Sequence, residues 1–229
     1  MNPHDDAAGA VLLDIDGTLV DSSYVHTAAW SRAFREAGHP VDSWRTHRCI
    51  GMGGDLLLAE LLGDRADELG DEVKRRHDEH YAASAVELHR FDGVPELLAA
   101  ITERGARAVL ASSASPAELD ILRTVLEVDE DTHPITSSQD VDAAKPHPDL
   151  VHAALAVSGA GADRAVFVGD AVWDVEAAAR AGLPCVGVLT GGISAAELTG
   201  AGAVAVYRSV AELGEDIDSS PLRRAWPDA

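Results

Sequence analysis

Short apolar runs recur along this chain of 229 residues, and some of them lead into acidic or serine residues. Helical patterns lie between several of these runs, and strands that alternate with helices favour a parallel sheet covered on both faces. We therefore predict an α/β fold with a doubly wound, Rossmann-like parallel sheet. Ligands of such sheets bind beyond the carboxyl ends of the strands. The predicted strands are residues 10–13, 106–111, 165–168, 184–189 and 203–207.

The first run leads into two carboxylates, Asp14 and Asp16, and then into Gly17. Positions i and i+2 of an extended strand point to the same face, so we expect both carboxylates to face one spot. Two buried carboxylates that close repel each other unless a cation lies between them or one is protonated. Mg²⁺ prefers oxygen ligands and fits this arrangement. The alternative is a strand that ends in an acidic turn, since Asp-Gly is a common turn signal.

Further candidate site residues follow other apolar runs or a polar loop. Ser112 comes directly after residues 108–111, and Lys145 stands before a proline at the end of a polar loop. Asp170 and Asp174 follow the run at 165–168, and a spacing of four residues places them on one face of a helix. Asp174 has three open interpretations: it binds an ion through water, it holds Lys145, or it is a first-turn acid favoured by the helix dipole.

No strong strand pattern lies between residues 13 and 106. Helical spacing of apolar residues predicts helices at 22–37, 55–62 and 66–88. We predict an inserted α-helical cap of residues 22–90 and a core of residues 1–21 and 91–229. The tail from 216 to 229 is polar with two prolines, and we expect it to pack loosely or to fray.

Composition narrows the function classes. Hydrophobic residues make up 46% of the chain, enough for a packed core, and the formal net charge is −21. A surface this acidic repels nucleic acid and anionic membranes, so we expect neither as a partner. Phosphate binding would then need a local positive focus such as a metal ion, Lys145 or a helix N-terminus.

Nothing in the sequence indicates export or membrane insertion. The first residues are polar and acidic, unlike a signal peptide, and no apolar run reaches the ~18 residues of a membrane span. Cys49 and Cys185 are far apart without metal-type spacing. A disulfide between them stays open, but reduced cysteines in a cytoplasmic protein are the better expectation.

Taken in order, the candidates match four motifs of a known superfamily: Asp14 with Asp16, then Ser112, then Lys145, then Asp170 with Asp174. The chain resembles phosphatases of the haloacid dehalogenase-like hydrolase superfamily with a helical cap after the first strand. It is similar to the branch that contains phosphoglycolate phosphatases and β-phosphoglucomutases. The resemblance runs from about residue 11 to about residue 192. Four motifs in order are far more specific than any one of them.

The resemblance implies a Mg²⁺-dependent phosphomonoester hydrolase that acts on a small phosphorylated metabolite through an aspartyl-phosphate intermediate. Asp14 would be the nucleophile, and Asp16 the general acid and then the base. Ser112 would bind a phosphoryl oxygen, and Lys145 would neutralise negative charge. Mg²⁺ would be held by Asp14, Asp170 and the main-chain carbonyl of Asp16.

The resemblance also implies substrate contacts. Gly17 and Thr18 would form a tight turn whose backbone approaches the phosphate, although an ordinary turn is an equal alternative. Ser113 is a further candidate beside Ser112. His26 and Trp30 match a His-x-x-Ala-Trp pattern at the hinge between core and cap, where His26 would touch Asp16 on closure; the alternative is a helical core stripe.

The cap loop is rich in glycine, and we expect Gly51, Gly53 and Gly54 to contact the substrate. Mutases of this branch carry an arginine in this loop for a second phosphate, where this chain has Gly54 and only Arg48 nearby. This departure favours simple hydrolysis over a phosphosugar mutase. A catalytically inactive binding protein on the same fold is a third hypothesis, and halide release is disfavoured by Asp16. We expect a monomer or weak homodimer.

Overall fold

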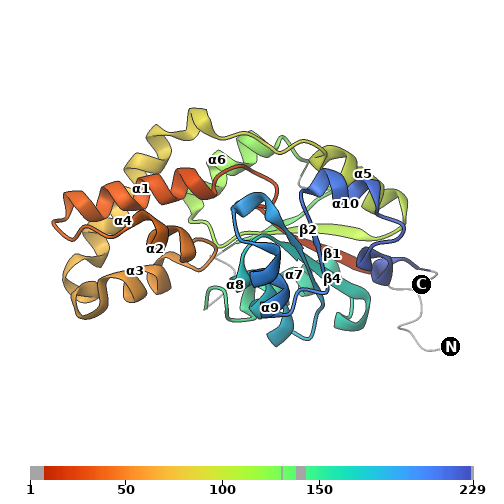
Figure 1. The fold of residues 1–229 in the computed structure, drawn as a ribbon. Coiled ribbons are helices and arrows are strands. Elements are labelled where there is room, and N and C mark those ends of the chain that lie inside the picture. Colours follow the sequence, from red (N-terminus) through yellow and green to blue (C-terminus); the bar gives the residue numbers. More distant parts are fainter. Residues whose placement is uncertain (1–7, 130, 138–142, 228–229) are drawn as a thin grey trace.

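A computed structural model of the chain describes residues 8–129, 131–137 and 143–227 (Figure 1). Its centre is a six-stranded sheet in the order β3-β2-β1-β4-β5-β6, and every pair in it is parallel. The prediction of a doubly wound, Rossmann-like sheet is therefore confirmed. The strands are β1 (Ala10–Asp14), β2 (Arg107–Ala111), β3 (Ile135–Thr136), β4 (Ala165–Gly169), β5 (Cys185–Val188) and β6 (Ala205–Tyr207).

The sheet is buried on both faces because its strands are apolar at consecutive positions. In β1, Val11 and Leu13 join one apolar cluster, whereas Ala10 and Leu12 join another. Helices α5 (Val94–Glu103), α6 (Pro116–Leu126) and α10 (Val210–Glu215) contribute to the first cluster. Helices α7 (Asp149–Ser158), α8 (Val172–Arg180) and α9 (Ala195–Ala201) contribute to the second.

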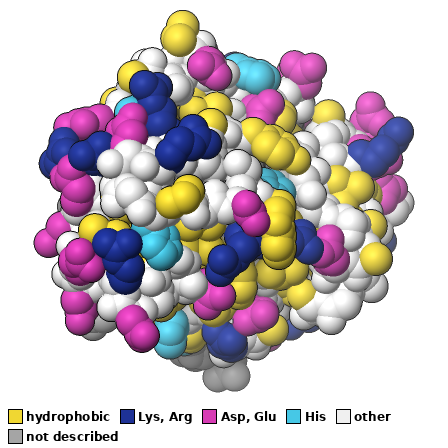
Figure 2. Space-filling model, turned by 60° about the vertical axis from the view of Figure 1, so that its left-hand side comes forward, with side chains coloured by type: hydrophobic (Ala, Val, Ile, Leu, Met, Phe, Trp, Pro, Cys, Tyr) yellow, Lys and Arg dark blue, Asp and Glu magenta, His cyan; other side chains and the backbone are white. Residues whose placement is uncertain are grey.

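A group of helices leaves the sheet after β1 and lies to one side of it (Figure 1, left). It comprises α1 (Ser23–Glu36), α2 (Ser43–Arg48), α3 (Gly54–Leu62) and α4 (Ala66–Ala83), with the short 3₁₀ helices η1 (Gly63–Arg65) and η2 (Ala85–Glu87). We call this group the helical insert. Trp30, Phe34, Leu57 and Val73 belong to its own apolar cluster. Figure 2 shows acidic and basic side chains interspersed on this side of the molecule.

Some elements differ from the prediction. The helix expected at 66–88 ends at Ala83, because the following chain must run extended beside the start of the insert: the amide of Asp21 donates to the carbonyl of His89, and Phe91 to Leu19. Helices α2, α9 and α10 and strand β3 were not predicted. Each is too short to give a clear periodic pattern.

The prediction of a loosely packed tail was wrong for residues 216–227. These residues include the 3₁₀ helix η6 (Pro221–Ala225), whose Leu222 and Ala225 are fully buried in the same cluster as Val11. Ser220 caps it by accepting from the amide of Leu222 at 3.2 Å. The prediction failed because it rested on the mean polarity of the tail, which does not reveal two isolated buried apolar residues.

Among the described residues, no helix has the length and apolar character needed to cross a membrane. Cys49 and Cys185 are both buried, and both are free thiols.

Candidate active site

Three neighbouring strands deliver the candidate residues to one edge of the sheet. Asp14 ends β1, Ser112 follows β2 and Asp170 follows β4, and β1 pairs with both of the other strands. A cavity of about 480 Å³ lies between this edge and the helical insert. Its charged and polar lining includes Asp14, Asp16, His26, Asp55, Lys74, His77, Asp78, Ser113, Ser115, Glu118, Lys145 and His147.

Lys145 is buried between two carboxylates. Its Nζ donates to Asp14 and, at 2.7 Å, to Oδ1 of Asp174. The other oxygen of Asp174 accepts from the backbone amides of Asp170 at 3.1 Å and Ala171 at 3.0 Å, at the start of α8. Asp174 therefore holds Lys145 and caps the helix at the same time, so two of its three possible roles are seen together.

Asp170 is fixed by the turn that follows β1. Thr18 Oγ1 donates to its carboxylate at 2.8 Å. Gly17 has a φ of 77°, and a Cβ there would lie 2.5 Å from the same carboxylate; at Gly191 it would lie 1.6 Å away. Only glycine fits these positions. Gly17 and Thr18 thus both lie against Asp170, and the expected approach of their backbone to a phosphate stays a prediction.

The cluster of Asp14, Lys145, Asp170 and Asp174, which we call the acidic centre, carries more negative than positive charge. Ligand oxygens of its three buried carboxylates lie within 4.8 Å of one another, with one ammonium group among them. Burial raises the pKa of Asp14 to about 8, against the opposing effect of Lys145. Burial, with Asp174 and Asp14 nearby, also raises the pKa of Asp170 well above its usual value. A divalent cation with a preference for carboxylate oxygen, such as Mg²⁺, fits this excess charge.

Asp16 lies just beyond the end of β1 and lines the same cavity as Asp14, but its environment differs from that of Asp14. Its carboxylate accepts from Ser22 Oγ at 2.7 Å, Ser112 Oγ at 3.1 Å and His26 Nε2 at 3.2 Å. Burial alone would raise the pKa of Asp16, but these hydrogen bonds, led by that from His26, lower it below the usual value. Asp16 is therefore held ionised at the cavity wall.

The two serines after β2 point differently. Ser112 is fully buried, and its hydroxyl is bonded to Asp16 and to the amide of Ala114, so the structure places it on the Asp16 carboxylate instead of at the cavity. Ser113 lines the cavity. The predicted contact between Ser112 and a phosphoryl group is an expectation for the substrate-bound protein.

The glycine loop of the insert packs closely on the core. Gly51, Gly53 and Gly54 all line the cavity. A Cβ on Gly53 would lie 2.2 Å from Cβ of Ala144, and one on Gly51, where φ is 94°, would lie 2.9 Å from Cβ of Ala171. Glycine thus permits the loop to approach the core.

Several cavity residues were not candidates in the sequence analysis, among them Lys74 and His77 on α4 and Glu118 on α6. Lys74 Nζ lies 2.9 Å from Oδ1 of Asp55. The available signal was a spacing of three residues between Lys74 and His77 on one helical face, but the many charges of α4 masked it. Arg48, by contrast, pairs with Glu197 and is not among the lining residues.

Comparison with known proteins gives a consistent result. Residues 8–182 match the family model of the haloacid dehalogenase-like hydrolases. The chain is 31% identical over 216 residues to a phosphoglycolate phosphatase of Rhodospirillum rubrum, covering 90% of this chain and 89% of that protein. It is 30% identical over 180 residues to the N-acetylmuramic acid 6-phosphate phosphatase of Pseudomonas aeruginosa, covering 76% and 78% of the two chains.

Comparison with solved structures supports the same family. The crystal structure of a hydrolase from Pseudomonas syringae matches with a TM-score of 0.88 and 34% sequence identity, covering 92% of this chain and 98% of that one. The similarity therefore includes both the sheet and the helical insert.

Proposed function

Because this chain belongs to the haloacid dehalogenase-like hydrolase family, we propose that it is a Mg²⁺-dependent phosphatase of a small phosphorylated metabolite. The reaction would pass through a phosphoryl group bound to Asp14. The observation that carries this proposal is the pair Asp14 and Asp16, both on the cavity wall and each held by different partners. The phosphatase names of similar proteins support it.

In the first step, a carboxylate oxygen of Asp14 attacks phosphorus. The new O–P bond forms as the bond to the leaving alcohol breaks, and Asp16 donates a proton to the leaving oxygen. Lys145 favours the ionised form of Asp14, because its ammonium group bonds directly to that carboxylate. Asp174 keeps Lys145 in place.

In the second step, water attacks the phosphorus of the aspartyl phosphate. Asp16 takes the water proton, the bond between Asp14 and phosphorus breaks, and inorganic phosphate leaves. The low pKa of Asp16 suits its role as the resting base. Its acid role requires it to be protonated when the ester arrives, and His26 is the bonded partner that can share that proton.

The acidic centre fits the metal that the family implies. Asp14 and Asp170 would hold Mg²⁺ with the main-chain carbonyl of Asp16, and the bound ion would neutralise charge on the phosphoryl oxygens. The chain itself holds the metal ligands in position, because Thr18 donates a hydrogen bond to Asp170. Asp174 is less available as a ligand, since its two oxygens already accept from Lys145 and from the start of α8.

The cavity supports hydrolysis over mutase chemistry. A mutase would need a second phosphate site in the helical insert, but Arg48 is paired with Glu197, and Lys74 is paired with Asp55. We propose that residues 22–90 act as the cap that selects the ester, working on a core of residues 1–21 and 91–229. We also propose that the protein is a cytoplasmic monomer or weak homodimer that does not bind nucleic acid, as its net charge of −21 supports.

Phosphate release from a panel of phosphomonoesters tests the proposal. The panel should include phosphoglycolate and hexose phosphates, each with Mg²⁺ and with a chelator. We expect metal-dependent release that Asp14→Asn removes and that Asp67→Asn, an exposed carboxylate on α4, leaves intact. Full activity in Asp14→Asn would refute the mechanism. If no ester releases phosphate, but a bisphosphate sugar activates the interconversion of hexose phosphates, the protein is a mutase instead.

A further inference from the structure

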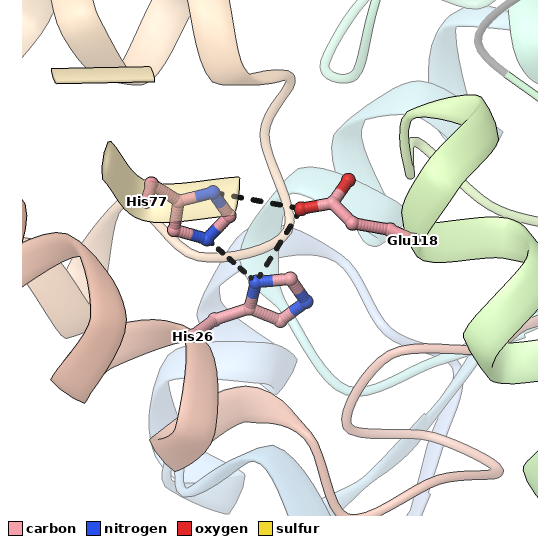
Figure 3. Close-up of side chains that lie close together, drawn as sticks. All are labelled: His26, His77 and Glu118. Atoms are coloured by element: carbon pink, nitrogen blue, oxygen red, sulfur yellow. Dashed lines mark hydrogen bonds and ion pairs between the residues drawn. The ribbon is translucent and has the colours of Figure 1, made fainter. Parts of the chain in front are cut away.

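Two histidines and a glutamate meet at the junction of the helical insert and the core. His26 comes from α1, His77 from α4 and Glu118 from α6, and all three side chains point toward one another (Figure 3). We call them the histidine cluster. His26 Nδ1 lies 3.1 Å from His77 Nε2. Glu118 Oε1 lies 3.6 Å from His77 Nδ1 and 4.0 Å from His26 Nδ1. All three are at least nine-tenths buried.

The outer nitrogen of each ring faces a carboxylate. His26 Nε2 is 3.2 Å from Asp16, and His77 Nδ1 is 3.0 Å from Asp78. A carboxylate only accepts hydrogen bonds, so each outer nitrogen carries the hydrogen. If both rings are neutral, the two inner nitrogens both present lone pairs, 3.1 Å from each other. The pair is therefore joined either by one shared proton or by a metal cation between the rings.

We propose that this cation is a transition-metal ion such as Zn²⁺, held between His26 Nδ1 and His77 Nε2 at a site separate from the acidic centre. Glu118, whose carboxylate lies nearest His77 Nδ1 in this structure, would be the third ligand, since one ligand atom of each residue lies within 4.8 Å of the other two. Two imidazoles and one carboxylate are a known zinc donor set, whereas Mg²⁺ prefers oxygen. Two nitrogens at about 2.0–2.1 Å from a tetrahedral Zn²⁺ lie about 3.3 Å apart. The separation of 3.1 Å in the structure is close to that value.

The surroundings hold the rings in this orientation. His26 stacks on Tyr81 with ring centroids 4.1 Å apart, and His77 stacks on Trp30 at 3.9 Å. The carboxylates on the outer nitrogens fix the tautomers, as such groups do in zinc sites. Little reorganisation is therefore needed when the ion binds.

The local charge favours a divalent ion over a single shared proton. Asp16, Asp78 and Glu118 all face the two rings. The cation on this side of the cavity, Lys74, is already bonded to Asp55. One proton would offset only a third of the formal charge of these three carboxylates, whereas a doubly charged ion would offset two thirds of it.

Binding would have a mechanical consequence. Two ligands belong to the helical insert and the third to the core, so the ion would fasten α1 and α4 to α6. It would also immobilise His26, which bonds Asp16. If the proposed phosphatase function holds, excess Zn²⁺ should reduce phosphate release at saturating Mg²⁺, and this effect alone rests on that function.

Metal binding is the direct test. The full-length protein is stripped with a chelator and returned to buffer with Mg²⁺ in large excess. It is then titrated with Zn²⁺ against a chromophoric chelator. We expect one Zn²⁺ per chain, with affinity lowered at least about 10-fold in His77→Gln and in Glu118→Gln. Glutamine at 118 preserves the capping box of α6. His152→Gln on α7 is the matched control and should bind like the parent.

The acidic centre is the competing zinc site, so Asp170→Asn is titrated in parallel. We expect unchanged Zn²⁺ affinity in Asp170→Asn. Loss of binding in that variant alone, or equal binding in the parent and His77→Gln, would overturn the proposal. An absence of Zn²⁺ binding would also overturn it, and would leave a shared proton between the rings.

Thermal unfolding gives a second readout that does not depend on activity. Zn²⁺ should raise the Tm of the parent, because it binds only the folded state. The same rise should be absent in His77→Gln, whose fold is checked by circular dichroism. An equal rise in both proteins would contradict the assignment.

Discussion

The acidic centre and the histidine cluster lie on the same cavity but are built in different ways. In the acidic centre, Asp14 and Asp170 follow adjacent parallel strands, so the sheet itself brings them together. In the histidine cluster, His26, His77 and Glu118 come from three helices, two in the insert and one in the core. Backbone pairing assembles the first, whereas side-chain packing assembles the second.

The two sites also treat charge differently. The acidic centre confines three carboxylates around Lys145, and under the proposed function an added cation would offset the remaining negative charge. The histidine cluster spreads its carboxylates around two imidazole rings that stack on Trp30 and Tyr81. Disturbing the first should therefore affect chemistry and folding together. Disturbing the second should chiefly change how the insert meets the core.

The chain's only two lysines allow the sharpest test of this contrast. Lys145→Met leaves two buried carboxylates without their partner, and we expect a loss of about 3–5 kcal/mol in stability and about 10³-fold or more in phosphate release. Lys74→Met removes an exposed pair with Asp55 and should change stability by less than about 1 kcal/mol. Urea denaturation and steady-state kinetics measure both. Similar losses of stability and of phosphate release in the two variants would contradict the expected difference between the two lysines.

Removing a carboxylate from the acidic centre should stabilise the metal-free protein. Burial raises the pKa values of Asp14 and Asp170 in the folded state. The folded chain then binds more protons than the unfolded chain between about pH 4 and pH 8, so stability falls as the pH rises through this window. We expect Asp170→Asn to raise the Tm in chelator by a few degrees and to flatten this slope.

Mg²⁺ provides the check on that prediction. It should stabilise the parent more at pH 8 than at pH 5.5, because the carboxylates are more fully ionised at the higher pH. Denaturation curves at both pH values, with Mg²⁺ or with chelator, measure this. A metal-free parent that gains stability from pH 5.5 to pH 8 would contradict the expected sign.

Substitution of the two serines after β2 should distinguish a residue that positions Asp16 from one that contacts the substrate. Ser112→Ala removes one hydrogen bond to Asp16, which raises the pKa of that carboxyl. We expect phosphate release to fall about 10-fold, equivalent to about 1.4 kcal/mol, and the acidic limb of the pH-rate profile to move to higher pH. Ser113→Ala should act mainly on KM, since this residue lines the cavity. An unchanged limb in Ser112→Ala would place its role at the phosphoryl group alone.

The smallest effect is expected outside both sites, where Glu36 on α1 meets His80 on α4. The bond from His80 leads the interactions that lower the pKa of Glu36 to about 2. Its stabilising effect is thus present above pH 4.5 and is lost as the pH falls toward 2. Because the pair is exposed, Glu36→Gln should lower the Tm at pH 7 by less than about 2 °C. A larger drop would show that surface pairs, and not the histidine cluster, join α1 to α4.

The sequence predicted the sheet well because its strands are short apolar runs, and it placed Asp14 and Asp170 at strand ends that the topology makes neighbours. It could not place Ser112 on Asp16, because that contact depends on where the chain turns after β1. His77 and Glu118 were missed for a similar reason. Their meeting depends on how α4 packs beside α6, which no local pattern records.

The tail illustrates the same limit from the opposite end of the chain. Average polarity predicted a frayed segment, but two buried residues, Leu222 and Ala225, decide its position. In the glycine loop, Gly53 was expected to face substrate. Its close approach to Ala144 depends on a long-range contact between insert and core, which sequence spacing does not specify.

The packing of the tail bears on local opening of the molecule. Strand β1, which ends in Asp14, pairs with β2 and β4, and its Val11 and Leu13 share an apolar cluster with Leu222 and Ala225 of η6. Detachment of η6 would open that cluster to solvent on one face of the central strand. Hydrogen exchange in β1 therefore reports on η6 as well as on the sheet, because a segment unfolds locally with a free energy set by its buried contacts.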